Sequence, residues 1–258
     1  MENLTPVTRE RHAGRKWQRF RDYTFASRME TLPVVGVELQ QAAMTTPLAF
    51  VETSGRYSLV AVLSVIPGRN MLVSPKGGWL GGHIPVMLRA SPFWMVERPE
   101  AISSIMCMDE AAGLLPEGSA DGEDFFDKDG NFSPALKAIG EFLAQMESDV
   151  RTTDMAVAAL AEAGVIMPWN FTIKTELGTE PALGGLHAIN EAAFNALGDD
   201  AYLKLRKENA MPIAYAQMFS MGAVRIFEHL AKLQPAATLP DSIQKMFSRG
   251  SDETVRFN

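Results

Sequence analysis

The chain has 258 residues, of which 47% are hydrophobic and 21% are charged, with a formal net charge of −7 at pH 7. This length suffices for a large buried core in one domain or two, and the single cysteine, Cys107, excludes an intramolecular disulfide. The net negative charge argues against general binding to nucleic acid, because phosphate contacts require clustered Lys and Arg.

Hydrophobic patterning gives no sign of a membrane or export segment. The chain contains no run of roughly 20 apolar residues, the length that spans a bilayer. The first thirty residues lack the apolar stretch of a signal peptide. We therefore expect a cytoplasmic protein without a transmembrane segment.

Charge is unevenly distributed along the chain. Residues 1–30 carry seven basic and four acidic side chains, a net of +3, and residues 4–30 have the pattern of an irregular arm with aromatic anchors. Residues 97–149 carry three basic and thirteen acidic side chains, a net of −10. Opposite charges in one chain attract each other. We therefore favour pairing within the chain, over binding to an external polyanion, for the arginines of the arm, Arg11, Arg15, Arg19 and Arg21.

The N-terminal half is predicted to be rich in β-strands. Residues 38–44 have the composition of a short helix, which ends before a proline. Two β-prone runs, residues 48–51 and 57–65, flank a Gly-containing turn and predict a hairpin. Further strands are predicted at residues 70–73, 93–97 and 102–108.

The hydrophobic period changes from strand to helix at Ser133. Ser133 suits an N-cap and Pro134 suits the first helical position, and apolar residues follow at helical spacing. A second helix over residues 153–163 is predicted to end at Gly164. Residues 169–174 alternate as in a strand. Further helices are predicted at residues 191–197, 199–207 and 212–233.

These elements predict an α+β fold. Its strand-rich N-terminal half, containing an antiparallel or mixed sheet, is expected to pack with a helical C-terminal half. The chain shows no internal repeat and no low-complexity linker. We therefore predict a single domain over residues 1–235, followed by a tail at residues 236–258.

No motif predicts a metal ion or a cofactor. Asp127, Asp129 and Asn131 alternate as at the start of a calcium loop, but the glycine comes at position 4 instead of 6, and Ala138 occupies position 12, which requires Glu. The histidines do not stand at metal-ligand spacing. The glycine-rich segments lack the pattern of a P-loop or a dinucleotide fingerprint, and no Gly-x-Ser-x-Gly motif is present.

Three acidic residues stand beside apolar runs, where burial raises a carboxylate pKa and favours proton transfer. They are Glu38, Asp109 and Glu110, and Tyr23 and Arg89 complete this candidate acid–base or ligand-contact set. Such carboxylates more often cap a strand or pair with arginine, and Arg89 is the expected partner. His83, beside a glycine in a turn-rich loop, is interpreted as a solvated residue.

Aromatic residues concentrate in the strand-rich half. Together with Tyr23 they are candidates for an aromatic cleft that binds a peptide or another organic ligand. Packing in the core of the β-half is the alternative interpretation and the one we favour. The candidates are Trp79, Phe93, Trp94 and Trp169.

A series of short motifs follows in a fixed order along most of the chain. The N-terminal members are Arg11-His12, Tyr23-x-Phe25-Ala26, Pro33, Glu38, Ala42-Ala43, Pro47 and Phe50. The middle members are Gly77-Gly78-Trp79, Ile84-Pro85, Arg89, Pro92-Phe93 and Asp109-Glu110. The C-terminal members are Phe126-Asp127-Lys128-Asp129-Gly130, Ser133-Pro134-Ala135-Leu136, Pro168-Trp169, Glu191, Asn195-Ala196-Leu197 and Ala214-Tyr215-Ala216. As an ordered set they resemble the SapC family, named for an open reading frame of a bacterial surface-layer gene cluster.

The chain departs from this family pattern at three positions. His83 stands where the family commonly has an aromatic residue, which weakens His83 as a metal ligand. Ser91 stands where a tyrosine is usual, and Ala111 where a serine is usual. If either of those hydroxyl groups takes part in chemistry, this chain lacks it.

The resemblance implies no particular reaction and no catalytic residues. The family name implies an association with the surface layer or the cell envelope, and relatives in Gram-negative bacteria are encoded near outer-membrane receptors and flavin-dependent halogenase-like genes. We therefore expect a non-catalytic binding or accessory protein of an envelope-related pathway, without cofactor, that engages a protein or peptide partner. The alternative is an enzyme with a discontinuous acid–base site that acts on a small molecule or peptide. Assembly as a homo-oligomer stays open.

Overall fold

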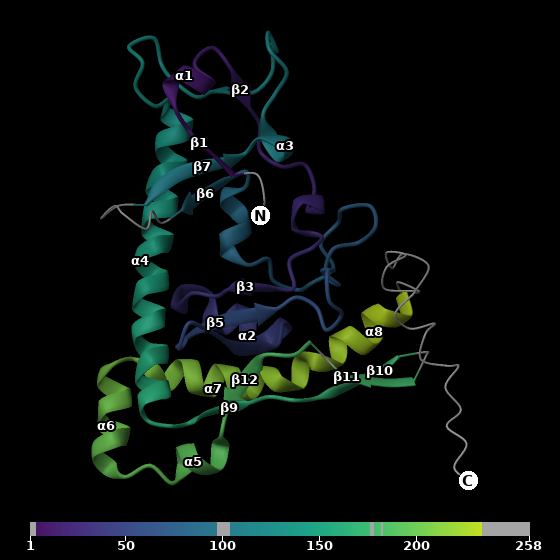
Figure 1. The fold of residues 1–258 in the computed structure, drawn as a ribbon, viewed down its shortest axis with the longest axis vertical. Helices are drawn as coiled ribbons and strands as arrows, with labels where there is room; N and C mark the ends of the chain where they lie inside the picture. Colours follow the sequence, from purple (N-terminus) through teal and green to yellow (C-terminus); the bar gives the residue numbers. More distant parts are fainter. Residues whose placement is uncertain (1–3, 97–103, 176–177, 182, 234–258) are drawn as a thin grey trace, which may run out of the picture.

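A single long helix, α4 (Pro134–Glu162), runs along one side of the molecule (Figure 1). The computed structural model describes residues 4–96, 104–175, 178–181 and 183–233, so the predicted tail at 236–258 lies outside the described residues. With 29 residues, α4 is about 44 Å long. A small sheet packs near its start, and a larger sheet and the C-terminal helices lie near its end. The predicted α+β class is confirmed.

Local sequence determines where α4 begins and ends. The Ser133 side chain accepts a hydrogen bond from the backbone N–H of Leu136 at 3.2 Å, and Pro134 occupies the first turn, as predicted. At the other end, Gly164 has a φ of +69°, the left-handed conformation in which a helix stops.

The prediction of two separate helices over this region is wrong, because the structure has one continuous helix there. The stretch between them, residues 147–152, is polar but contains neither Gly nor Pro, and Glu147 pairs with Arg151 one turn later at 3.4 Å. Its one apolar residue, Val150, packs with Met146 against a small third cluster of Val35 and Val86, between the two larger sets of buried side chains. Leu136, Ile139 and Leu143 join the core of the small sheet, and the second half of α4 contributes to the larger core.

The larger sheet has five antiparallel strands. Their order is β3 (Thr31–Pro33), β5 (Arg56–Val62), β4 (Leu48–Thr53), β12 (Leu186–Ile189) and β9 (Ile166–Pro168). The predicted hairpin is confirmed as β4 and β5, and its turn residues Ser54 and Gly55 both have positive φ, as a tight hairpin requires. The sheet therefore takes three strands from the N-terminal half and two from the C-terminal half.

The smaller sheet joins the N-terminal arm to the middle of the chain. Its order is β1 (Leu4–Pro6), β7 (Ile105–Asp109) and β6 (Phe93–Val96), all antiparallel. The ends of the two strands predicted here reach into residues 97–103, outside the described residues. The described arm also contains α1 (Arg9–His12) and β2 (Lys16–Trp17), which pairs with β8 (Glu123–Asp124).

Two other predicted strands differ from the structure. Residues 70–73 form no strand, and only Val73 makes a bridge, to Trp79. Only the second half of the strand predicted at 169–174 forms a strand, β10 (Thr172–Thr175), which pairs with β11 (Gly178–Pro181), and β9 ends directly before the predicted range. The remaining short elements are η1 (Thr24–Ala26), η2 (Gly36–Glu38), α2 (Leu39–Thr45), η3 (Val86–Ala90) and α3 (Glu110–Gly113).

The C-terminal helices cover the end of the larger sheet. They are α5 (Glu191–Asn195), α6 (Asp199–Lys207), α7 (Ala210–Ser220) and α8 (Arg225–Leu233), with the 3-10 turn η4 (Met221–Val224) dividing the one helix predicted over 212–233. From α7, the buried Gln217 side chain donates to the Leu48 carbonyl and accepts from the Ile189 backbone N–H. One amide thus joins β4 and β12, strands from opposite halves of the chain. Among the described helices, none is both long and apolar enough to cross a bilayer.

Substitution of two glycines, one within α4 and one just after its end, is expected to change stability in opposite directions. Gly164→Ala forces a side chain into the left-handed region and is expected to lower the free energy of unfolding by about 1 kcal/mol. Gly140→Ala lies inside the helix, where an added Cβ meets no atom of a neighbouring element within 4 Å, so it is expected to raise that free energy by about 0.5–1 kcal/mol. Urea denaturation of both variants measures the difference. Equal signs would contradict the assignment of the helix end.

Candidate functional site

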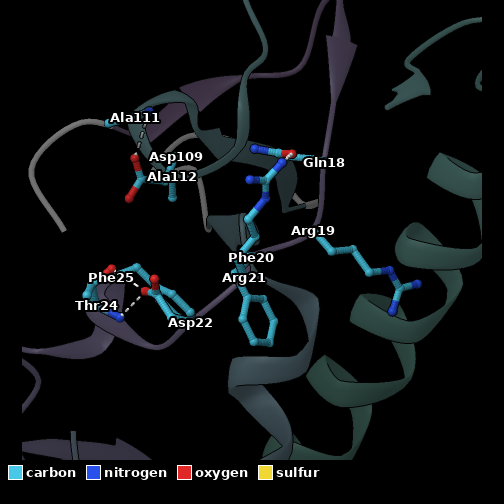
Figure 2. A pocket seen from close by; sticks show the side chains of 10 residues that line it. All are labelled: Gln18, Arg19, Phe20, Arg21, Asp22, Thr24, Phe25, Asp109, Ala111 and Ala112. Carbon is cyan, nitrogen blue, oxygen red and sulfur yellow. Dashed lines mark hydrogen bonds between the residues drawn. The ribbon is translucent and has the colours of Figure 1, made fainter. Parts of the chain in front are cut away.

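A polar pocket of about 390 Å³ lies between residues 18–25 and residues 109–112 (Figure 2). The first segment follows β2, and the second is the junction of β7 with α3. Asp22 and Asp109 lie on one side of the pocket and the Arg21 guanidinium lies across from them, whereas the Arg19 side chain, which also lines the pocket, extends away from both carboxylates. The pocket thus places two carboxylates opposite one guanidinium group. We call it the polar pocket.

Short turns hold both carboxylates in place. The Asp109 side chain accepts a hydrogen bond from the Ala111 backbone N–H at 3.2 Å and thereby caps α3. The Asp22 side chain accepts from the backbone N–H of Thr24 at 2.9 Å and from its hydroxyl, which lowers the pKa of Asp22. Both sets of hydrogen bonds use Oδ1.

Aromatic rings form the base of the polar pocket. Phe20 and Phe25 line it, and their ring centroids lie 5.1 Å apart. Tyr23 lies 5.2 Å from Phe20 and 5.4 Å from Trp79, so these four residues make one aromatic cluster. The structure therefore brings together two of the predicted candidates, Tyr23 and Trp79. Phe20 and Phe25 were not predicted as site residues, although their spacing around Tyr23 is visible in the sequence.

Glu110, next to Asp109, contacts the N-terminal arm. Its carboxylate accepts two hydrogen bonds from Arg11, at 2.5 and 2.9 Å, which lower the pKa of Glu110. The Nε2 atom of His12 lies 3.3 Å from the same carboxylate. The expected pairing of Arg11 with the acidic middle is confirmed. Arg89, predicted as the partner of these carboxylates, is instead exposed on η3.

His12 is fully buried, with 0% of its side chain exposed. Its ring packs against Phe125 at 4.7 Å between centroids, and its Nδ1 atom lies 3.2 Å from both the N–H and the carbonyl of Thr8. Burial, which disfavours the charged imidazolium, lowers the pKa of His12. The Arg11–Glu110 ion pair and the buried His12 therefore add to the strand pairing of β1 and β2 that holds the arm.

Glu38 is buried, with 5% of its side chain exposed, and joins two distant segments. One carboxylate oxygen accepts from His83 Nε2 at 2.7 Å and from the Val86 backbone N–H at 2.8 Å. The other accepts from the Val35 backbone N–H at 3.4 Å. The interpretation of His83 as a solvated residue is wrong, because its side chain is 12% exposed and bonded to Glu38. Nothing in the sequence near either residue indicates a contact across 45 positions.

The other aromatic candidates lie in different environments. Phe93 is 0% exposed in the core of the small sheet, edge-on to Trp17 at 4.7 Å. Trp94, the next residue on the strand, belongs to the larger core and borders a cavity of about 160 Å³ beside α4. Trp169 is buried beside Phe171. In the described contacts these three side chains do not join the aromatic cluster of Tyr23 and Trp79.

The five acid–base candidates are likewise divided among several places. Asp109 lines the polar pocket, Tyr23 belongs to the aromatic cluster, and Glu110 faces the arm. Glu38 holds the loop that contains His83, and Arg89 is exposed. Within the described ranges, no three His, Cys, Asp or Glu side chains gather as a bound metal ion would require.

A second hollow, of about 850 Å³, lies between α2 and the helical segment formed by α7 and η4. Its two most exposed large side chains are apolar, with 77% of Met44 and 79% of Phe219 open to solvent, and the exposed polar residue Gln40 also lines it. Small residues lie along it, including Gly36, Ala43 and Ala216. We call this hollow the apolar groove. Sequence reasoning missed it, because α2 and α7 are far apart in the chain.

Comparison with known proteins gives one match. The sequence profile of the SapC family matches residues 7–226. Searches of curated proteins and of solved structures return no match. The matched range includes the residues of the polar pocket, the Glu38–His83 pair and the apolar groove.

Removal of the Glu38 carboxylate is expected to destabilise the fold. Glu38→Ala leaves the buried N–H groups of Val35 and Val86 without their acceptor, which costs about 2–4 kcal/mol. Glu38→Gln retains one oxygen acceptor and is expected to cost less. Glu117→Ala, in an exposed loop, serves as the control and is expected to change stability by less than about 0.5 kcal/mol. Urea denaturation provides the measurement, and equal losses for Glu38→Ala and the control would contradict the bonding described.

Burial of His12 predicts a pH-dependent stability. Because the pKa of His12 is lower in the folded state, the unfolded chain binds the proton more readily. Stability is therefore expected to fall as the pH drops below about 6.5, the unfolded value, and to level off below the folded pKa.

The test compares the unfolding free energies of the wild type and His12→Gln between pH 8 and pH 5. The difference in unfolding free energy between the wild type and the variant is expected to become smaller as the pH falls. The pKa of Glu110 is lowered in the folded state, so its contribution to stability is lost only below about pH 4.3, outside the pH range of the test. His229→Gln, on an exposed position of α8, is the control. An advantage that stays constant with pH would show that His12 does not titrate as described.

Proposed function

The chain belongs to the SapC family, and from this premise we propose that it is a non-catalytic binding protein that engages an apolar helical segment of a partner protein. The observation that carries this proposal is the apolar groove, with its exposed Met44 and Phe219. Large apolar side chains that stay open to water in a folded protein mark interaction surfaces when they gather in one hollow.

The groove is free of charge along its length. The sequences of α2, α7 and η4 contain no Asp, Glu, Lys or Arg. Complete burial of Met44 or Phe219 is worth about 1.5–3 kcal/mol per side chain. The small residues between them let another backbone approach closely. An amphipathic helix with apolar side chains at positions i, i+3 or i+4, and i+7 fits these features.

Charge favours a protein segment over a membrane as the occupant. Anionic lipid surfaces are bound through clustered Lys and Arg beside an apolar face. The helices of the groove provide none, and the whole chain carries a net charge of −7. The same charge argues against nucleic acid.

The cellular setting is part of the proposal. We place the protein in the cytoplasm, in a pathway related to the envelope or the surface layer. The support for this setting is the family name. An enzyme with a discontinuous acid–base site is the weaker alternative, because the described contacts divide its five candidate residues among separate places.

Site-specific photo-crosslinking in the source organism tests the proposal. A photo-reactive residue at Met44 is expected to give a discrete adduct with one partner, and the partner residue attached is expected to lie in an apolar helical stretch. The same residue at Met155, which is 61% exposed on α4, provides the control. Similar adducts from both positions, or none from Met44, would contradict the proposal.

Substitution of the exposed aromatic residue gives the quantitative test. Phe219→Glu is expected to weaken binding of the isolated partner segment at least about tenfold, because a carboxylate enters an uncharged groove. Leu203→Glu, on exposed α6, is the matched control and is expected to leave affinity unchanged. Because both side chains are exposed, neither variant is expected to unfold the protein, which thermal denaturation verifies. Equal affinity of the two variants would contradict the role of the groove.

A further inference from the structure

We propose that the polar pocket binds a small zwitterion of the α-amino acid type, with its ammonium group toward Asp109 and Asp22 and its carboxylate toward Arg21. The site is separate from the apolar groove and does not depend on the function proposed for that groove. Its volume of about 390 Å³ is near the lower end of the range for small-molecule sites. It suits a small molecule and is too small for a docked helix.

The charges that line the pocket balance one another but do not pair with one another. Arg19, Arg21, Asp22 and Asp109 all line the hollow, and Figure 2 shows the Arg21 guanidinium across from the two carboxylates, with the Arg19 side chain extending away from them. In the described part of the chain, Arg21 donates to Gln18 at 3.2 Å, and neither Arg19 nor Arg21 forms an ion pair. Charges held apart across a hollow are complementary to a ligand that carries both signs.

The two carboxylates are already oriented before any ligand arrives. Asp22 and Asp109 are each fixed through Oδ1 by a backbone N–H of their own turn. Their second oxygens do not take part in those bonds. A ligand ammonium group that donates to these oxygens meets carboxylates that are already held in place by the turns. Binding therefore loses less side-chain entropy, which favours affinity.

Aromatic rings of the pocket lining provide the apolar contact. Phe20 and Phe25 line the hollow and contact each other, and both contact Tyr23, which contacts Trp79. Aromatic rings offer large apolar area with few rotatable bonds. An amino acid with a large apolar side chain therefore fits better than one with a small or charged side chain.

Ligands of a single charge are disfavoured by the same arrangement. A phosphate group would face Asp22 and Asp109, and a divalent cation would face Arg19 and Arg21. Repulsion between like charges would therefore weaken the binding of either ligand. A zwitterion meets opposite charge on both sides.

The first experiment measures binding to the wild-type chain by ligand-observed NMR and calorimetry. Its probes are free phenylalanine, leucine and glycine, the amide of phenylalanine, which lacks the carboxylate, and N-acetylphenylalanine, which lacks the ammonium group. Free phenylalanine or leucine is expected to bind with a Kd below about 1 mM, and each blocked form at least about tenfold more weakly. Inorganic phosphate is expected not to compete.

Two variants then assign the charges. Asp109→Asn keeps the oxygen that caps α3 and removes the charge, so it is expected to reduce the preference for the free over the N-acetylated ligand. Arg21→Gln is expected to reduce the preference for the free ligand over the amide. Asp121→Asn and Arg28→Gln, at exposed positions outside the pocket, are the controls.

Several outcomes would overturn the proposal. They are the absence of saturable binding by any free amino acid, equal binding of free and blocked forms to the wild type, and competition by phosphate. The proposal would also be overturned if Asp109→Asn and Arg21→Gln showed the same ligand preferences as their control variants. Because the blocked ligands test the wild-type protein, the result does not depend on the folding of any variant.

Discussion

The structure depends on the continuity of α4 through two separate cores. Its first half buries Leu136, Ile139 and Leu143 against the small sheet, and its second half buries Val157 and Leu160 against the larger one. Between them the helix is mostly polar, with Met146 and Val150 at a small third cluster, and residues 147–152 contain neither Gly nor Pro. A helix of this kind is stabilised by tertiary packing along its length more than by its own propensity. The helix therefore relates the two sheets to each other, together with Trp94, which extends from the small sheet into the larger core.

Several residues that mark the family are the contacts that attach distant segments to this frame. Arg11 joins the arm to Glu110, and His12 packs against Phe125 beside the acidic turn. Glu38 holds the segment that begins η3, through Val86. In the described contacts these residues order the chain by joining segments that are distant in the sequence.

Elements governed by neighbouring residues could be predicted from the sequence, and those governed by distant ones could not. The Ser133 cap, the end of α4 at Gly164 and the hairpin at its Gly-containing turn each follow from residues within a few positions. The place of β12 in the sheet follows instead from Gln217, which bonds both β4 and β12. No local pattern shows that partnership.

The candidate sites follow the same rule. Tyr23 and Trp79 stand out by composition and do meet, whereas the Glu38–His83 pair joins residues 45 positions apart. The apolar groove was invisible for a further reason. A groove-lining helix has the same apolar spacing as a helix buried in a core, so periodicity does not tell an open face from a covered one. Only the packing of α2 beside α7 shows which side chains stay exposed.

The two hollows, opposite in chemical character, share one support. Residues 77–86 reach the polar pocket at one end, where the Gly77 carbonyl accepts from the Tyr23 backbone N–H at 2.8 Å. At the other end Val86 binds Glu38, directly before α2, which lines the apolar groove. Within the segment, the Trp79 indole donates to the His83 carbonyl at 2.9 Å and stiffens the connection. This segment therefore connects the charged pocket and the apolar groove through hydrogen bonds at both of its ends, and the two proposed binding sites share it as a support.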